Sequence, residues 1–143
     1  MKALLRTGLI AAGITVLAAC STGTSNEKGE PAMPSFEQLS GEPWQVQTLN
    51  GESIENASVT LVFPEQGRVA GRAACNNYMG SYRAEGEQFS IQPGGMTMKA
   101  CPQPLMTLER QFVDALKGIN HAVINEEGTL LLTGEGIAIQ ASR

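Results

Sequence analysis

The sequence of residues 71–101, GRAACNNYMGSYRAEGEQFSIQPGGMTMKAC, decides the fold. Its interior contains three short strand-like runs, at residues 82–84, 88–91 and 96–98. Turn signals separate them at Glu85-Gly86 and at Pro93-Gly94-Gly95. Cysteines lie near its start, at Cys75, and at its end, at Cys101. The stretch therefore predicts a β-meander bracketed by two cysteines.

Alternating residues predict further strands on both sides of the meander. Val59, Leu61 and Phe63 fall on one face of an alternating segment, and Trp44 and Val46 share a face of another. The expected strands cover residues 44–48, 58–63 and 68–73 before the meander and residues 121–125, 129–133 and 137–141 after it. Because it shares its face with Val46, Trp44 is expected to anchor the core rather than to stack on a ligand.

Residues 104–117 predict one amphipathic helix. Pro104 suits its first turn, Lys117 its last turn and Gly118 the position just after it. The apolar stripe, at i, i+3, i+7, i+10 and i+11, is Leu105, Leu108, Phe112, Ala115 and Leu116. A single helical turn is also expected at residues 35–39, with Ser35 as its N-cap.

Residues 1–19 have the order of residues that a secretory signal has. Lys2 and Arg6 come first, an uncharged and largely apolar run follows, and small residues precede Cys20. The run is too short to span a bilayer comfortably. The sequence LAAC at residues 17–20 resembles the lipobox of bacterial lipoproteins, which implies a signal peptide over residues 1–19 and a lipid on Cys20. The alternatives are an ordinary signal peptide and a short apolar helix kept as an anchor.

Residues 20–34 are small, polar and proline-containing, so we expect a lipid anchor and flexible tether before a domain at residues 35–143. By resemblance to Gram-negative lipoproteins, Ser21 implies the outer membrane, with the domain facing the periplasm. Loss of residues 1–19 leaves 8 basic and 14 acidic residues, a net charge of −6. Such an acidic surface argues against nucleic acid as a partner.

Many short antiparallel strands with one helix indicate an α+β fold that is mostly antiparallel β. We expect about 7–8 short strands in a curled sheet or small barrel, with the helix covering one end or face.

Several motifs resemble those of the META domain of HslJ-type heat-shock lipoproteins. They are Trp44 with Leu49-Asn50-Gly51, the pair Cys75-Asn76 with Tyr78, Gly80 and Tyr82, and Met98-x-x-Cys101. The resemblance covers about residues 40–141 and implies antiparallel strands with one helix in a protein that is often exported and lipid-anchored. It implies no agreed enzymatic activity. Ala74 departs from the pattern, because many members have glycine before the cysteine.

Cys75 and Cys101 are an even pair in an exported domain, so we expect a disulfide. One rival is a metal site shared with His121, but no CxxC or HxxxH spacing supports it. The other is a hydrolase with Cys75 as nucleophile and His121 as base. That reading is weaker because a partner cysteine would oxidise the nucleophile. His121 is therefore expected to be a partly exposed strand residue.

Arg72, Asn77, Tyr78 and Arg83 form the candidate binding surface. The plainer interpretation is that Asn77, with Asn76, closes a turn through side-chain to backbone bonds and that Tyr78 packs on the meander. Similarly, Met96 and Met98 are expected to fill the core rather than to bind copper.

No phosphate-binding loop, nucleophile elbow or paired-carboxylate spacing appears in the sequence, so we expect neither an enzyme nor a cofactor. The favoured hypothesis is a membrane-anchored envelope lipoprotein with a stress-related or binding role, whose partner is an envelope protein or a small ligand. A protein-inhibitory module is one alternative, because a disulfide-stiffened loop can be presented rigidly to a partner. A small hydrolase that uses Cys75 or His121 is the other.

Overall fold

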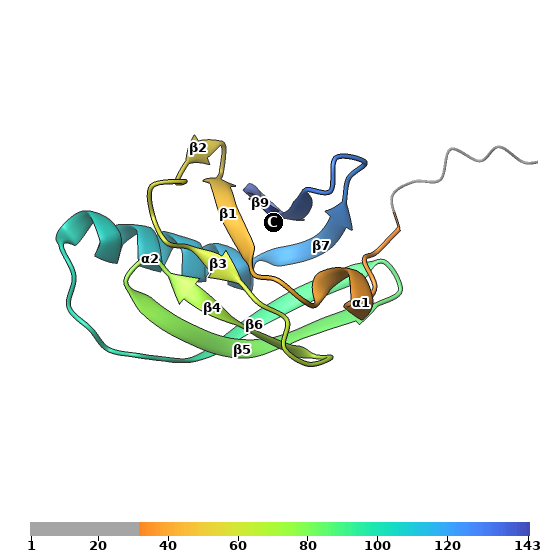
Figure 1. The fold of residues 1–143 in the computed structure, drawn as a ribbon, viewed down its shortest axis with the longest axis horizontal. Helices are drawn as coiled ribbons and strands as arrows, with labels where there is room; N and C mark the ends of the chain where they lie inside the picture. Colours follow the sequence, from red (N-terminus) through yellow and green to blue (C-terminus); the bar gives the residue numbers. More distant parts are fainter. Residues whose placement is uncertain (1–31) are drawn as a thin grey trace, which may run out of the picture.

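The computed structural model describes residues 32–143. The predicted signal peptide (1–19), the lipidation at Cys20 and all of the tether up to residue 31 lie outside the described residues. Within residues 32–143, two helices and nine strands build an α+β fold that is mostly antiparallel β (Figure 1). The predicted fold class is therefore confirmed, although the strands form two sheets and no closed barrel.

The helices and strands follow one another with short connections. In chain order they are α1 (Phe36–Leu39), β1 (Trp44–Leu49), β2 (Glu52–Ser53), β3 (Thr60–Leu61), β4 (Arg68–Ala73), β5 (Asn76–Glu85), β6 (Gln88–Met96), α2 (Gln103–Lys117), β7 (Ile119–Ile124), β8 (Leu130–Gly134) and β9 (Ile137–Ser142). One sheet has the order β2-β1-β9-β8-β7, with β3 also paired to β1, and the other has the order β4-β5-β6.

The segment around β3 joins the two sheets. β3 pairs with β1 in the larger sheet, while single bridges connect Val59 with Ala73 and Val62 with Ala70 of β4. The strands therefore curl around a common core instead of stacking as two separate layers. In Figure 1 the β4-β5-β6 sheet runs along the lower side of the molecule and β1, β7 and β9 lie above it.

Helix α2 packs against the β4-β5-β6 sheet and the common core. Its apolar stripe turns inward, and Phe112 and Leu116 are fully buried. Leu105 and Leu108 pack at the edge of the same core. The amphipathic helix predicted over residues 104–117 is thus confirmed, with one more residue at its start.

Helix α1 and Arg143 meet at Trp44. Ser35 caps α1 in a capping box with Gln38, as its position before Phe36 predicts. The Trp44 indole N–H donates to the Leu39 carbonyl (2.9 Å), and the Arg143 guanidinium lies 4.0 Å from the centre of the ring. Trp44 is therefore a core anchor, as expected from the face it shares with Val46.

The meander differs from its prediction in strand length. β5 already begins at Asn76, so Asn76 and Asn77 belong to a strand and not to a turn. Pro93-Gly94-Gly95 lies inside β6, where the register with β5 shifts between Tyr78 and Gly80. Gly94 and Gly95 form a β-bulge opposite Met79, and Pro93 is tolerated because β6 is the edge strand of its sheet.

One further expectation, that Met98 fills the core, is wrong. Met98 is 94% exposed and does not fill the core, whereas Met96 packs against it.

Ala74 has a left-handed backbone (φ 69°) and is buried. Because a left-handed conformation costs a residue with a Cβ about 1–2 kcal/mol, glycine is the easier choice at this position, in agreement with the motif that the sequence resembles.

Candidate functional site

The two domain cysteines form a disulfide between the start of β5 and the connection that precedes α2. The Cα atoms of Cys75 and Cys101 lie 6.0 Å apart, within the usual range for a disulfide. Cys75 is buried. Its sulfur is covalently bonded and is therefore not a free nucleophile.

Asn76, next to the disulfide, is the centre of a buried hydrogen-bond network. Its backbone N–H donates to Glu109 Oε2 (2.6 Å) and its Nδ2 donates to Glu109 Oε1 (3.1 Å). Its Oδ1 accepts from the Lys99 N–H (2.7 Å) and from Thr97 Oγ1 (2.8 Å), and its Nδ2 also donates to the Lys99 carbonyl (3.2 Å). The side chain of Asn76 therefore bonds to backbone as expected, but it fixes a distant loop rather than a local turn.

Glu109 is the residue that sequence reasoning missed. It lies on the buried face of α2 with 7% of its surface exposed, between apolar neighbours on the helix. Both carboxylate oxygens are used by Asn76. The available signal was its spacing: Glu109 lies four residues after Leu105 and three before Phe112, which places it on their helix face. A carboxylate on a buried face requires partners.

We expect Glu109→Gln to lower the free energy of unfolding by about 1–3 kcal/mol, since one oxygen that accepts from Asn76 becomes an NH₂ donor and leaves a buried donor unpaired. Chemical denaturation measures this difference. Asp114→Asn, at an exposed position of the same helix, is the matched control and should change stability by much less. Equal effects of the two variants would contradict the structural role of Glu109.

The outer face of the β4-β5-β6 sheet brings together three of the four predicted surface residues. Arg72 pairs with Asn77 across β4 and β5, and Arg83 extends outward further along β5. Arg68 and Met79 lie on the same face, by the alternation of the two strands. We call this surface the arginine face and define it by Arg68, Arg72 and Arg83 around Met79.

Tyr78, the fourth predicted surface residue, is buried and does not belong to the arginine face. Its ring packs edge-to-face with Phe112, with the centroids 5.9 Å apart, and its hydroxyl donates to the Thr60 carbonyl (2.9 Å). Burial raises the pKa of Tyr78 well above its usual value. Adjacent strand residues point to opposite sides, so Asn77 and Tyr78 cannot share a surface.

The arginine face is cationic and has an apolar centre. Met79 is 66% exposed and lies opposite Ala70, between the levels of Arg68 and Arg72. The ion pair found within residues 32–143 joins Lys117 to Asp114, so no carboxylate among these residues pairs with the three arginines. A hollow of about 660 Å³ covers the centre of the face. Its lining consists of Pro64, Gly67, Arg68, Val69, Ala70, Met79, Gly80, Ser81, Gln92, Pro93, Gly94 and Gly95.

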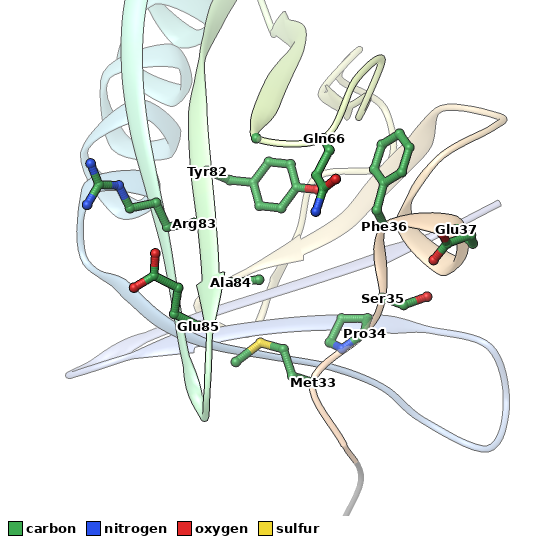
Figure 2. Close-up of a pocket in the computed structure, with 11 residues that line it drawn as sticks. Met33, Pro34, Ser35, Phe36, Glu37, Gln66, Tyr82, Arg83, Ala84 and Glu85 are labelled. Carbon is green, nitrogen blue, oxygen red and sulfur yellow. The ribbon is translucent and has the colours of Figure 1, made fainter.

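A second hollow, of about 460 Å³, lies between α1 and the end of β5 (Figure 2). In Figure 2 the ring of Tyr82 faces Phe36 across this hollow, while the side chains of Arg83 and Glu85 lie on the other side of the strand. The view shows the alternation that separates the inner residues of β5 from the arginine face. Glu85 marks the acidic end of that face.

His121 is an exposed residue of β7. Its Nδ1 lies 3.4 Å from the carbonyl oxygen of Glu87, and no hydrogen bond joins it to Cys75 within the described part of the chain. The nucleophile and the base that a Cys-His hydrolase needs are therefore not brought together.

Residues 32–143 contain neither a metal-binding cluster nor a membrane-spanning helix. In this part of the chain, no three His, Cys, Asp or Glu side chains are arranged to hold a metal ion. None of its helices has the length and apolar character that crossing a bilayer requires.

Comparison with known proteins identifies a matching family and similar structures. The family model described as the META domain matches residues 37–142. The structure is similar to an NMR structure of a protein from Burkholderia xenovorans, with a TM-score of 0.62, 22% identity and coverage of 82% of this chain and 95% of that one. A second NMR structure of a protein gives a TM-score of 0.62 and 21% identity, covering 77% of this chain and 95% of the other. No curated protein matches the sequence significantly.

Proposed function

We propose that this chain, which belongs to the META domain family, is a lipid-anchored, non-catalytic binding protein of the bacterial envelope. Its arginine face binds an acidic segment of another envelope protein. The resemblance to heat-shock lipoproteins adds a stress-related role. The outer membrane, with the domain in the periplasm, is the proposed location, because Ser21 follows the lipidated cysteine.

The observation that carries this proposal is the placement of charge. The chain is acidic, with a net charge of −4, yet three of the five arginines in residues 32–143 lie on one face of a three-stranded sheet. Their guanidinium groups have no carboxylate partner within these residues. An acidic partner supplies the missing negative charges, and the exposed Met79 supplies an apolar contact at the centre of the face. Charged pairs around such a contact raise the association rate and make the binding specific.

The anchor is tested by replacing Cys20 with serine. We expect a fatty-acid probe to label the wild-type protein and the membrane fraction to contain it, because several acyl chains on one residue bind a bilayer firmly. The Cys20→Ser variant should lose both label and membrane association. Equal labelling of the two proteins would contradict lipidation at Cys20.

Site-specific photocrosslinking in living cells tests the binding surface. A photoreactive residue at position 79 is expected to give a discrete crosslinked protein, while the same residue at exposed position 140 on β9 should not. The identity of the crosslinked protein, and an acidic segment within the crosslinked peptide, are read by mass spectrometry. The same products from both positions, or crosslinks to lipid in place of protein, would contradict the proposal.

The hydrolase alternative makes a different demand on the chain. If His121 were a catalytic base, His121→Ala would abolish turnover in a panel of ester, amide and glycoside substrates while the protein stayed folded. We expect no turnover by the wild-type protein in such a panel, because His121 and Cys75 are not paired. Turnover that disappears in His121→Ala would replace the binding proposal with an enzymatic one.

A further inference from the structure

The connection from β6 to α2 presents a short exposed segment, Thr97 to Ala100. It runs along the outside of the molecule between the sheet and the helix (Figure 1). The chain makes no turn or bend from Thr97 to Pro102, and Met98 is 94% exposed. A side chain that is 94% exposed buries almost no surface in the core.

The backbone of this segment is fixed at alternate residues. The N–H of Thr97 donates to the Asn77 carbonyl (3.0 Å), and Asn76 bonds to both the N–H and the carbonyl of Lys99. Among residues 32–143, no hydrogen bond involves the backbone of Met98 or Ala100. Thr97 and Lys99 therefore tie the segment to the domain, and Met98 and Ala100 offer free backbone donors and acceptors to the outside.

The support under the segment is rigid on both sides. Asn76 is buried and is itself held by Glu109 of α2, and Cys101 is bonded to Cys75. A segment held in its bound conformation loses little conformational entropy when a partner binds it.

We propose that residues 97–100 are an inhibitory loop for serine endopeptidases that accept a long apolar side chain, with Met98 in the specificity pocket. Such enzymes bind an extended peptide by adding it to an enzyme strand, with main-chain hydrogen bonds at alternate residues and side chains in pockets. The free main-chain groups at Met98 and Ala100 match this spacing. A hydrophobic slot of the chymotrypsin type takes the Met98 side chain. This proposal goes beyond the arginine face and does not depend on it.

The same support explains why the loop inhibits the endopeptidase and is not digested by it. The enzyme serine attacks the Met98 carbonyl carbon, and complete hydrolysis would consume one water and leave a carboxylate on Met98 and an amino group on Lys99. Lys99 stays bonded to Asn76 and is linked through Ala100 to the disulfide, while Met98 stays attached to the fixed Thr97. The new ends cannot separate, so resynthesis of the peptide bond competes with release of the cleaved chain.

Inhibition of chymotrypsin by the mature, oxidised protein tests the loop. We expect tight competitive inhibition of peptide-substrate hydrolysis, weakened about 100-fold or more by Met98→Glu, as for a residue that dominates an interface. Met98→Lys should transfer inhibition to trypsin, whose pocket carries a carboxylate. Gln140→Glu, which adds the same charge at an exposed position of β9, should inhibit as the wild type does.

Three results would overturn the proposal. They are absence of chymotrypsin inhibition at micromolar protein, inhibition that Met98→Glu leaves unchanged, and rapid complete cleavage after Met98 without inhibition. Circular dichroism of each variant checks that it is folded. Met98→Lys is a further check, because an unfolded variant could lose chymotrypsin inhibition but could not gain trypsin inhibition. Loss of crosslinking at position 79 would leave these measurements unaffected, so the two proposals fail separately.

Discussion

Replacing Phe112 with alanine is expected to lower the free energy of unfolding by about 3–5 kcal/mol, which is a large share of the stability of a small domain. Phe112 is fully buried on the inner face of α2, and its ring contacts Tyr78 of β5. The substitution removes the contact between helix and sheet and leaves a cavity that the rigid strands cannot fill. Urea denaturation, followed by circular dichroism, measures the loss.

The matched control is Gln111→Ala, at the exposed neighbouring position of α2. Because alanine is a good helix former, this variant should stay within about 0.5 kcal/mol of the wild type. If Phe112→Ala unfolds at the same urea concentration as Gln111→Ala, the helix does not pack on the sheet through Phe112.

Loss of the Cys75–Cys101 disulfide is expected to cost about 3.5 kcal/mol in the chain-entropy model. The two cysteines are 26 residues apart in the sequence, so the bond closes a loop of substantial length and restricts the unfolded chain. The double variant Cys75→Ala/Cys101→Ala should therefore unfold at a lower denaturant concentration. The Asn76 contacts to Lys99 should keep its native state folded at low temperature.

The control is the wild-type protein measured with and without reductant. Reduction should reproduce most of the loss seen in the double variant, and the double variant itself should not respond to reductant. A wild-type protein made in the periplasm that carries two free thiols at Cys75 and Cys101 would contradict the bond.

Local patterns predicted the elements whose signals are periodic. The apolar stripe from Leu105 to Leu116 identified α2 to within one residue, and alternation identified the strands before and after the meander. These signals succeed because each element has one face turned to the same core.

The errors lie where the signal depends on partners distant in sequence. Pro93-Gly94-Gly95 has the composition of a turn, and only the pairing with β5 makes it a bulged strand. The partner of the Glu109 carboxylate, Asn76, is known only from the fold. The local sequence cannot identify the hydrogen-bond partner of a polar side chain when that partner is 33 residues away.

The same dependence on distant partners explains why the candidate surface was predicted only in part. Arg72, Asn77 and Arg83 lie on the outer face, but Tyr78 does not, and strict alternation along β5 would have excluded it. Arg68 and Met79 join the face through cross-strand pairing, which needs the register of β4 and β5. Register is set by the fold and was not available from the residues alone.

The charge of the arginine face is the central claim, and its reversal tests that claim most directly. Crosslinking from position 79 is measured in cells that carry Arg68→Glu, Arg72→Glu and Arg83→Glu together, with Arg110→Glu on α2 as the control. We predict that the triple variant, folded and at wild-type abundance, loses the discrete crosslinked protein, because its carboxylates repel an acidic partner. The control should retain it. An unchanged crosslink in the triple variant would contradict the claim that this face recognises an acidic partner.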